Sequence, residues 1–183
     1  MNSTLLGQTK GSDTIVFLYD EKGNKYGFDY NGTKYYYIFN VQGDVIGILN
    51  QAGQKIVSYT YDPWGKVLSV DGSEASTIGQ LNPIRYRGYY YDTETGFYYL
   101  QSRYYDPTTR RFLNADGIIG ANQDAICYNL FAYCSNNPIM FTDASGNRVN
   151  MALFNKSKIR KSAKSAVPLQ NEPAVTTSST VRC

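Results

Sequence analysis

Three short strings in the first half of the sequence share one pattern: an aromatic residue, Asp or Asn, two variable residues, Gly and a polar residue. They are YDEKGN at 19–24, FNVQGD at 39–44 and YDPWGK at 61–66, with their aromatic residues 20 and 22 positions apart. This period predicts one repeated unit, a β-hairpin whose turn uses the Asp or Asn and the Gly. A single hairpin is marginally stable in water, so we expect the hairpins to pair into a long sheet.

Composition supports a mainly β fold. The 183 residues include 18 tyrosines and 16 glycines, and only 18% are charged. Aromatic rings suit a pleated, half-buried surface, and glycine supplies the positive φ of tight turns. Asp20, Asn40 and Asp62 are interpreted as turn formers, because each loop has too few oxygen ligands for a calcium site.

The chain contains no histidine, which excludes Ser-His-Asp and Cys-His catalysis and an HExxH zinc site. Its three cysteines do not make a disulfide framework, and without histidine they are poor zinc ligands. We expect Cys127 and Cys134 to be small buried residues, and we predict no metal and no cofactor. Any catalysis must use carboxylates, Tyr, Lys, Arg or Cys.

Charge divides the chain near residue 147. Residues 148–183 hold seven of the 18 basic side chains and one of the 15 acidic ones, so this segment carries +6 and the preceding residues −3. A disordered tail is predicted there, and its basic run KSKIRKSAK is the one feature that could bind nucleic acid. The sequence has no signal-peptide pattern and no apolar run of membrane-spanning length, so export would have to be encoded elsewhere in a longer chain.

Several strings in the second half resemble the RHS-repeat-associated core of bacterial RHS/YD-repeat proteins, especially the wall-associated WapA-like group. They are RYRG at 85–88, YYYDTETGFYYLQSRYYDP at 89–107, RFLNAD at 111–116 and NLFAYCSNNP at 129–138. The resemblance covers about residues 13–147. It implies a β-sheet that spirals into a hollow shell, a core segment that plugs one end, and an enclosed C-terminal effector, often a toxin used in contact-dependent competition.

On this resemblance the chain divides into an N-terminal lead at 1–12, YD/RHS repeats at 13–80, the repeat-associated core at 81–147 and a variable tail at 148–183. The partners implied are its own C-terminal effector segment and the remaining shell of a longer parent chain. The implied location is secreted or bound to the cell wall or cell surface.

The family also implies an intramolecular aspartyl protease that cuts the chain after a P-x4-D-x-x-G-x motif, here PIMFTDASGN at 138–147. Two carboxylates sharing a small site cannot both ionise easily, so one can hold a proton while the other activates water. The residues carried over are Asp116 and Asp143 as the carboxylate pair, Arg103 as their basic partner, Pro138 and Gly146 as motif positions, and Asn147 and Arg148 on either side of the cut bond.

This motif departs from the family pattern. The chain has Asp143-Ala144-Ser145-Gly146 where Asp-Pro-x-Gly is usual, so the proline that stiffens the turn is missing, and Asn147 replaces an apolar residue. Small displacements in a catalytic site can cost about 100-fold in rate. The alternative interpretation is that Asp116 and Asp143 form turns in a plug and Arg103 pairs with a strand carboxylate.

Two further expectations concern residues 89–134. Tyrosines occupy both odd and even positions of 89–105, so both faces of these strands are aromatic. This favours a core that is buried on both sides. The rival function is a carbohydrate-binding module that holds cell-surface glycan on rings such as Tyr91 and Tyr99. Apolar residues at 126, 130 and 133 predict a short helix near 122–134, ended by Asn136-Asn137-Pro138. A non-functional gene fragment is the third interpretation.

Overall fold

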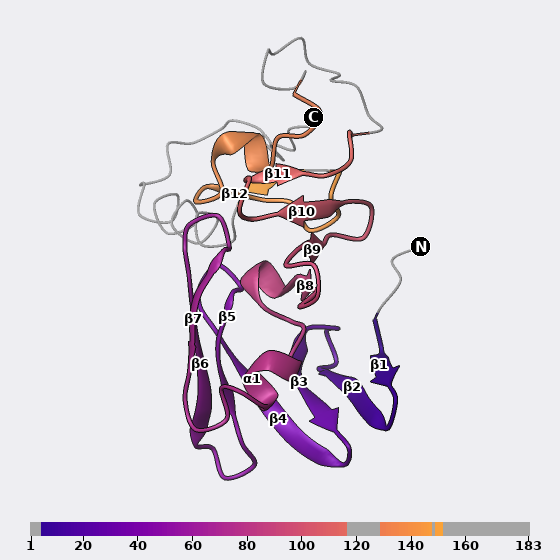
Figure 1. Cartoon of the computed structure of the whole chain (residues 1–183), viewed down its shortest axis with the longest axis vertical. Coiled ribbons are helices and arrows are strands. Elements are labelled where there is room, and N and C mark those ends of the chain that lie inside the picture. The colour runs from indigo at the N-terminus through magenta and orange to yellow at the C-terminus, as the bar shows by residue number, and fades with distance from the viewer. Residues whose placement is uncertain (1–4, 117–128, 148, 152–183) are drawn as a thin grey trace, which may run out of the picture. The chain divides into compact units, whose positions relative to one another are not determined.

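The structure is a computed structural model that describes residues 5–116, 129–147 and 149–151, with backbone alone for residue 151. Its described part is mainly β (Figure 1). Two compact units are present. The first comprises the described residues up to Asn40, Val45–Thr60 and Val67–Asn82, and the second comprises Val41–Asp44, Tyr61–Lys66 and the described residues from Pro83 onward. The predicted mainly β class is confirmed.

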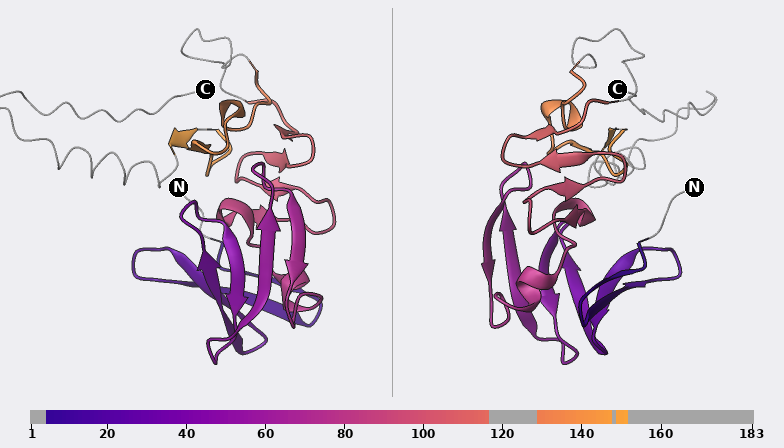
Figure 2. Two further views of the ribbon diagram at one scale, coloured as in Figure 1. Left: turned by 90° about the vertical axis from the view of Figure 1, so that its left-hand side faces the viewer. Right: turned by 45° about the vertical axis from the view of Figure 1, so that its right-hand side comes forward.

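The first unit contains a seven-stranded antiparallel sheet in which every strand pairs with the next one in the sequence, in the order β1 to β7. Figure 2 shows the strands following one another across the sheet, from indigo at β1 to magenta at β7. The strands are β1 (Gly7–Lys10), β2 (Asp13–Tyr19), β3 (Lys25–Tyr30), β4 (Thr33–Phe39), β5 (Val45–Leu49), β6 (Lys55–Tyr61) and β7 (Val67–Asp71).

The repeated strings lie in the connections β2–β3, β4–β5 and β6–β7, as the sequence predicts. Asp20 Oδ1 accepts the N–H groups of Lys22 and Asn24 at 2.9 and 2.7 Å. Asp62 Oδ1 accepts those of Trp64 and Lys66 at 2.8 and 2.9 Å. The side chain satisfies backbone donors that the turn leaves without strand partners, so both residues are turn formers. Asn50, between β5 and β6, caps its turn in the same way, although it lies outside the three strings.

One face of this sheet is closed by the short helix α1 (Ile78–Leu81) and the residue after it. Tyr37 Oη donates to Asn82 Oδ1 at 2.9 Å, and Tyr59 Oη donates to the Gly79 carbonyl at 2.7 Å, with all four residues in the first unit. A side chain at Gly79 would have its Cβ 2.9 Å from a methyl group of Val70, so the helix can lie this close only with glycine there.

The second unit has shorter elements. A four-stranded antiparallel sheet in the order β11-β10-β9-β8 and a separate pair β12-β13 carry only two or three residues per strand. The elements are the 3₁₀ turns η1 (Tyr86–Gly88) and η3 (Cys134–Asn136), and the strands β8 (Tyr90–Tyr91), β9 (Tyr98–Tyr99), β10 (Tyr104–Asp106), β11 (Arg111–Phe112), β12 (Phe141–Thr142) and β13 (Asn150–Met151).

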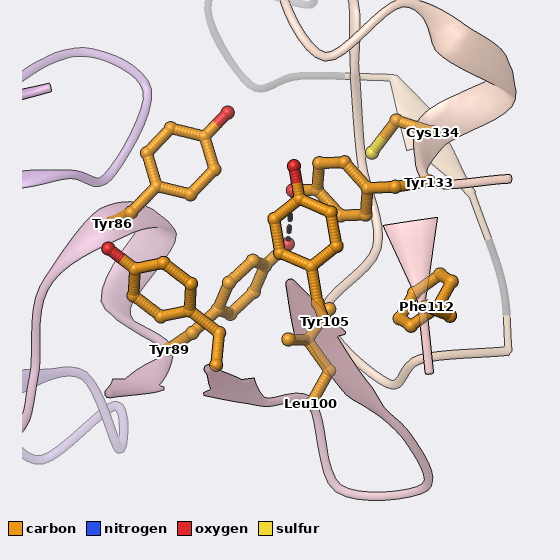
Figure 3. Packing of buried hydrophobic residues seen from close by; sticks show 8 residues of the cluster. Tyr86, Tyr89, Leu100, Tyr105, Phe112, Tyr133 and Cys134 are labelled. Atoms are coloured by element: carbon orange, nitrogen blue, oxygen red, sulfur yellow. Dashed lines mark hydrogen bonds between the residues drawn. The ribbon is translucent and has the colours of Figure 1, made fainter. Parts of the chain in front are cut away.

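Tyrosine rings form the core of this unit (Figure 3). We define the aromatic cluster as Tyr86, Tyr89, Tyr98, Leu100, Tyr105, Phe112, Tyr133 and Cys134, all buried. The rings of Tyr105 and Tyr133 stack with their centroids 4.1 Å apart. Burial raises the pKa of the Cys134 thiol to about 12, so Cys134 behaves as the small buried residue expected.

Three hydroxyls of the cluster bind one turn. Tyr86, Tyr105 and Tyr98 donate to the successive carbonyls of residues 63, 64 and 65, at 2.9, 2.8 and 2.7 Å. Each ring is therefore buried while its polar end is satisfied by backbone, as expected for these tyrosines.

The opposite face of the four-stranded sheet is not a second core. Tyr99 and Tyr104 pair across β9 and β10, lie 5.1 Å apart between ring centroids, and are 42% and 43% exposed. The expectation of burial on both sides is therefore wrong for these two rings.

The helix predicted near 122–134 lies partly outside the described residues, which omit 117–128. From Asn129 the described chain forms a turn, an isolated bridge between Ala132 and Arg111, and then η3. Positive φ values at Cys134, Ser135 and Asn136 are incompatible with a continuing α-helix. Most of the predicted tail, residues 152–183, also lies outside the described part, as does Arg148.

Candidate functional site

Arg103 lies at the centre of the predicted site. It follows a tight turn between β9 and β10 in which the Leu100 N–H donates to the Arg103 carbonyl at 2.9 Å, and Gln101 adopts a φ of 65°. The guanidinium packs on the Phe112 ring, with its central carbon 3.6 Å from the ring centroid. This places a cation that is 6% exposed against the aromatic cluster.

The Arg103 guanidinium brings the two predicted aspartates together. Its Nη2 lies 3.0 Å from Asp116 Oδ2 and 3.7 Å from Asp143 Oδ2. Both carboxylates are buried, with Asp116 9% and Asp143 1% exposed. The predicted partnership of Arg103 with both aspartates is thus present in the geometry.

The other Arg103 donors hold backbone carbonyls. Nη1 donates to Leu130 at 2.9 Å, and Nε donates to Gly146. Burial lowers the pKa of Arg103, while the charges of Asp116 and Asp143 act in the opposite direction. The ordinary pKa of arginine lies so far above neutral pH that Arg103 stays protonated. The site therefore holds one cation between two carboxyl groups.

Asp143 starts a tight loop between β12 and β13. Its Oδ1 accepts the N–H groups of Gly146 at 2.9 Å and Ser145 at 3.3 Å. Gly146 has a φ of +76°, and a Cβ there would lie 2.6 Å from Ser102 Oγ and 2.7 Å from the Leu100 carbonyl. Glycine is required at this position by conformation and by space. The loop forms although the proline of the family motif is missing.

Asp116 reaches the Arg103 guanidinium from a different segment of the chain than Asp143. It follows β11, and its backbone N–H donates to the Leu130 carbonyl at 2.9 Å. That carbonyl also accepts Arg103 Nη1, so one acceptor fixes both the backbone of Asp116 and the guanidinium that its side chain faces.

The bond predicted to be cut lies in the same loop as Asp143. Asn147 is half-buried, and its N–H donates to Ser145 Oγ at 3.4 Å. Arg148, on the other side of the bond, lies outside the described residues. The loop is closed by β12 and β13, in which Thr142 pairs with Asn150.

The start of the motif is held by residues that sequence reasoning missed. The Pro138 carbonyl accepts Arg87 Nη2, and the Ile139 carbonyl accepts Gln42 Nε2 at 3.3 Å. Arg87 in turn donates its backbone N–H to Asp44 Oδ1 at 2.9 Å. RYRG and FNVQGD carry these side chains, but nothing in either string indicates contacts 51 and 97 residues further along.

No group of three or more His, Cys, Asp or Glu side chains placed to hold a metal ion occurs within residues 5–116 and 129–151, as far as these are described. In the same part of the chain, no helix is long and apolar enough to cross a membrane.

Comparisons with known proteins give a consistent result. A model of the Teneurin YD-shell family matches residues 3–139. The tRNA3(Ser)-specific nuclease WapA of Bacillus spizizenii is 40% identical over 136 residues, which are 74% of this chain and 6% of that protein. The tRNA nuclease WapA of Bacillus subtilis is 38% identical over the same shares. The double-stranded DNA deaminase toxin A of Burkholderia cenocepacia is 35% identical, covering 63% and 8%.

Solved structures share the fold. A crystal structure of TcdB2-TccC3 with Cdc42 and a structure of the Photorhabdus luminescens Tc holotoxin pore both match with a TM-score of 0.61 and 24% identity, over 73% of this chain and 6% of theirs. The chain thus spans a small fraction of the proteins it resembles.

Proposed function

Because the chain belongs to the Teneurin YD-shell family, we propose that it is part of the β-shell of a toxin-type RHS/YD-repeat protein, and that it encloses or presents an effector segment after it. On this proposal its partners are that effector and the rest of the shell, and its place is outside the cell or on the cell surface.

The relatives support a scaffold function for this segment. They are named for different activities, cleavage of tRNA3(Ser) and deamination of double-stranded DNA, yet each contains the segment in 6 to 8% of its length. An activity that differs among proteins is not explained by the part that they share. The shared part is better explained as the container than as the toxin.

We further propose that the chain cuts itself after Asn147. The observation that carries this is Arg103 Nη2 lying 3.0 Å from Asp116 Oδ2 and 3.7 Å from Asp143 Oδ2. One cation between two buried carboxylates leaves one negative charge in excess, so binding a single proton makes the site neutral. One carboxyl can then act as acid while the other acts as base.

The reaction consumes one water. The ionised aspartate takes a proton from the water, whose oxygen attacks the Asn147 carbonyl carbon, while the protonated aspartate donates its proton to the carbonyl oxygen. Collapse of the tetrahedral intermediate breaks the C–N bond to Arg148, and the leaving nitrogen takes a proton from the site. The bond between Arg103 Nε and the Gly146 carbonyl would hold the chain one residue before the cut.

Intact mass separates self-cleavage from a purely structural site. The natural full-length product is purified as wild type, Asp116→Asn and Asp143→Asn, with Asp106→Asn as a control because the Asp106 carboxylate caps its own turn by accepting hydrogen bonds from Thr108 and Thr109. We expect a break after Asn147 in wild type and Asp106→Asn that is absent from both site variants. A folded, uncut wild type would leave Asp116 and Asp143 as structural residues.

Carbohydrate binding remains the second candidate function, and the exposed pair Tyr99 and Tyr104 is the observation that favours it. Exposed rings can stack on the apolar faces of sugars, whereas Tyr91 packs against the aromatic cluster. Glycan-array binding should therefore be lost in Tyr99→Ala and kept in Tyr26→Ala, a ring of similar exposure in the first unit. Equal binding by both variants would remove this candidate.

A further inference from the structure

The hydroxyl of Tyr89 lies where the aromatic cluster meets the Asp143 loop. It accepts the Asp143 backbone N–H at 3.2 Å. It also lies 3.0 Å from Thr142 Oγ1 and 3.2 Å from Tyr133 Oη, the hydrogen bond drawn dashed in Figure 3. A phenol has one proton to donate and can accept, so it can serve all three neighbours together.

The Tyr89 ring is held by the aromatic cluster and not by the loop that its hydroxyl contacts. It is 6% exposed and packs edge-on against Tyr86 and Tyr98, with centroids 6.2 and 6.4 Å apart. By contrast, the bonds of Asp143 Oδ1 go to Ser145 and Gly146 of its own loop, so they move with the loop. A bond from a packed ring holds the backbone of Asp143 in place relative to Arg103.

Burial raises the pKa of Tyr89 far above that of an exposed tyrosine, and the nearby Asp143 charge adds to this. The hydroxyl is therefore neutral throughout the range in which carboxylates work, and it can keep accepting the Asp143 N–H. A neutral group leaves the charge balance of Arg103 and the two aspartates unchanged, which suits positioning rather than proton transfer.

We propose that Tyr89 is a positioning residue of the self-cleavage site, whose hydroxyl fixes the backbone of Asp143 so that its carboxylate faces Arg103 beside Asp116. This inference rests on the proposed self-cleavage. It assigns a function to a tyrosine that lies 54 residues before Asp143 and that packing alone would explain as core.

Phenylalanine substitutions separate positioning from packing. Tyr89→Phe removes only the hydroxyl. Tyr98→Phe and Tyr105→Phe are matched controls, because each removes a hydroxyl from the same cluster that donates to a turn carbonyl, Gly65 or Trp64. Misplacement of a reacting group by about 1 Å can cost about 100-fold. We therefore expect Tyr89→Phe to slow self-cleavage about 10- to 100-fold and each control less than about threefold, at similar losses of thermal stability.

A second readout is independent of stability. If Asp143 moves away from the guanidinium, the charge balance of the site changes, so the pH–rate profile should shift in Tyr89→Phe and stay in place in both controls. Equal slowing by all three variants, or an unchanged profile in Tyr89→Phe, would overturn the proposal. If Tyr89→Phe does not fold, Thr142→Val removes a neighbour of the same hydroxyl from a half-buried strand residue, and a smaller shift in the same direction is expected.

An uncut wild type would refute self-cleavage without deciding the position of Asp143. In that case amide hydrogen exchange at Asp143 and the carbon-13 shift of its carboxyl are compared in Tyr89→Phe and Tyr98→Phe. Faster exchange and a changed carboxyl shift in Tyr89→Phe alone would support positioning, and identical values in the two variants would refute it.

Discussion

The first unit is held by long backbone ladders, whereas no strand in the described part of the second unit exceeds three residues. Neighbouring strands β2 and β3 pair over most of their length, and their turn is capped by the side chain of Asp20. In the second unit, the same kind of turn at Asp62 also receives the hydroxyls of Tyr86, Tyr98 and Tyr105. Where ladders are short, buried tyrosines take over the role of binding backbone to backbone.

Because the second unit depends on buried tyrosines, it should lose stability at alkaline pH, where their hydroxyls ionise. Burial raises the pKa of Tyr86 to about 12 and moves those of Tyr98, Tyr105 and Tyr133 upward as well. A tyrosine whose pKa is raised on folding stabilises the fold fully below pH 10, and this stabilisation is lost as pH rises toward its folded value. For Tyr86 alone, the rise from 10.0 to about 12 is worth about 3 kcal/mol.

The first unit should respond differently at first, although burial raises the pKa of Tyr37 in it as well. Burial lowers the pKa of Lys25 to about 8, so the unfolded chain binds more protons and this residue favours folding increasingly between pH 8 and 10.5. We expect phenolate absorbance and loss of near-ultraviolet dichroism to appear together above pH 10, while far-ultraviolet strand signal persists longer. Simultaneous loss of both signals would show that the two units unfold as one.

A pair of glycines gives the next largest contrast. Gly53 and Gly146 have the same φ of +76°, but a Cβ meets nothing within 4 Å at Gly53 and meets Ser102, Leu100 and Arg103 at Gly146. Alanine in this conformation costs about 1–2 kcal/mol at either position. Gly146→Ala should cost about 1–3 kcal/mol more, as expected of overpacking. Urea denaturation of both variants tests this, and equal losses would mean that the loop moves aside freely.

The smallest expected effect concerns a single exposed turn. Hydrogen bonds from the Asn24 side chain and backbone lower the pKa of Asp20 below its usual 3.8. Its stabilisation is therefore present above that value and is lost as pH falls through the lower folded one. Asp20→Asn keeps an oxygen acceptor but cannot titrate, so its thermal stability should fall less between pH 5 and 2 than that of wild type. Glu21→Gln is the control and should follow wild type.

The sequence predicts the first unit better than the second for a physical reason. A hairpin is a local structure, so the spacing of Tyr19, Phe39 and Tyr61 and the Asp-x-x-Gly turns contain most of what specifies it. Side-chain contacts that hold the second unit join residues 23 to 97 positions apart, as between Tyr86 and Pro63 or Gln42 and Ile139. No periodicity shows which hydroxyl will meet which carbonyl.

The candidate site was predicted from the sequence in part. Arg103, Asp116 and Asp143 were identified because their motifs resemble those of a family, and the structure places them around one guanidinium nitrogen. Tyr89, which binds the Asp143 loop, and Arg87 and Gln42, which bind the start of the motif, carry no local signal of these roles. The short helix was predicted from spacing at 126, 130 and 133, and the positive φ values at 134–136 that end such a pattern are set by packing rather than by periodicity.

The way the loop is held has a consequence for turnover. Arg103 Nε binds the Gly146 carbonyl, Ser102 Oγ binds the Ser145 carbonyl at 2.7 Å, and both acceptors precede the proposed cut. After the proposed hydrolysis the new C-terminus at Asn147 would stay tethered to Arg103 and Ser102 through these two carbonyls, because the cut breaks neither hydrogen bond. On the proposed self-cleavage, such a catalyst would be consumed by its first reaction: each molecule would release one C-terminal segment and leave a synthetic 138–151 peptide uncut, so the amount of released segment would equal the number of chains.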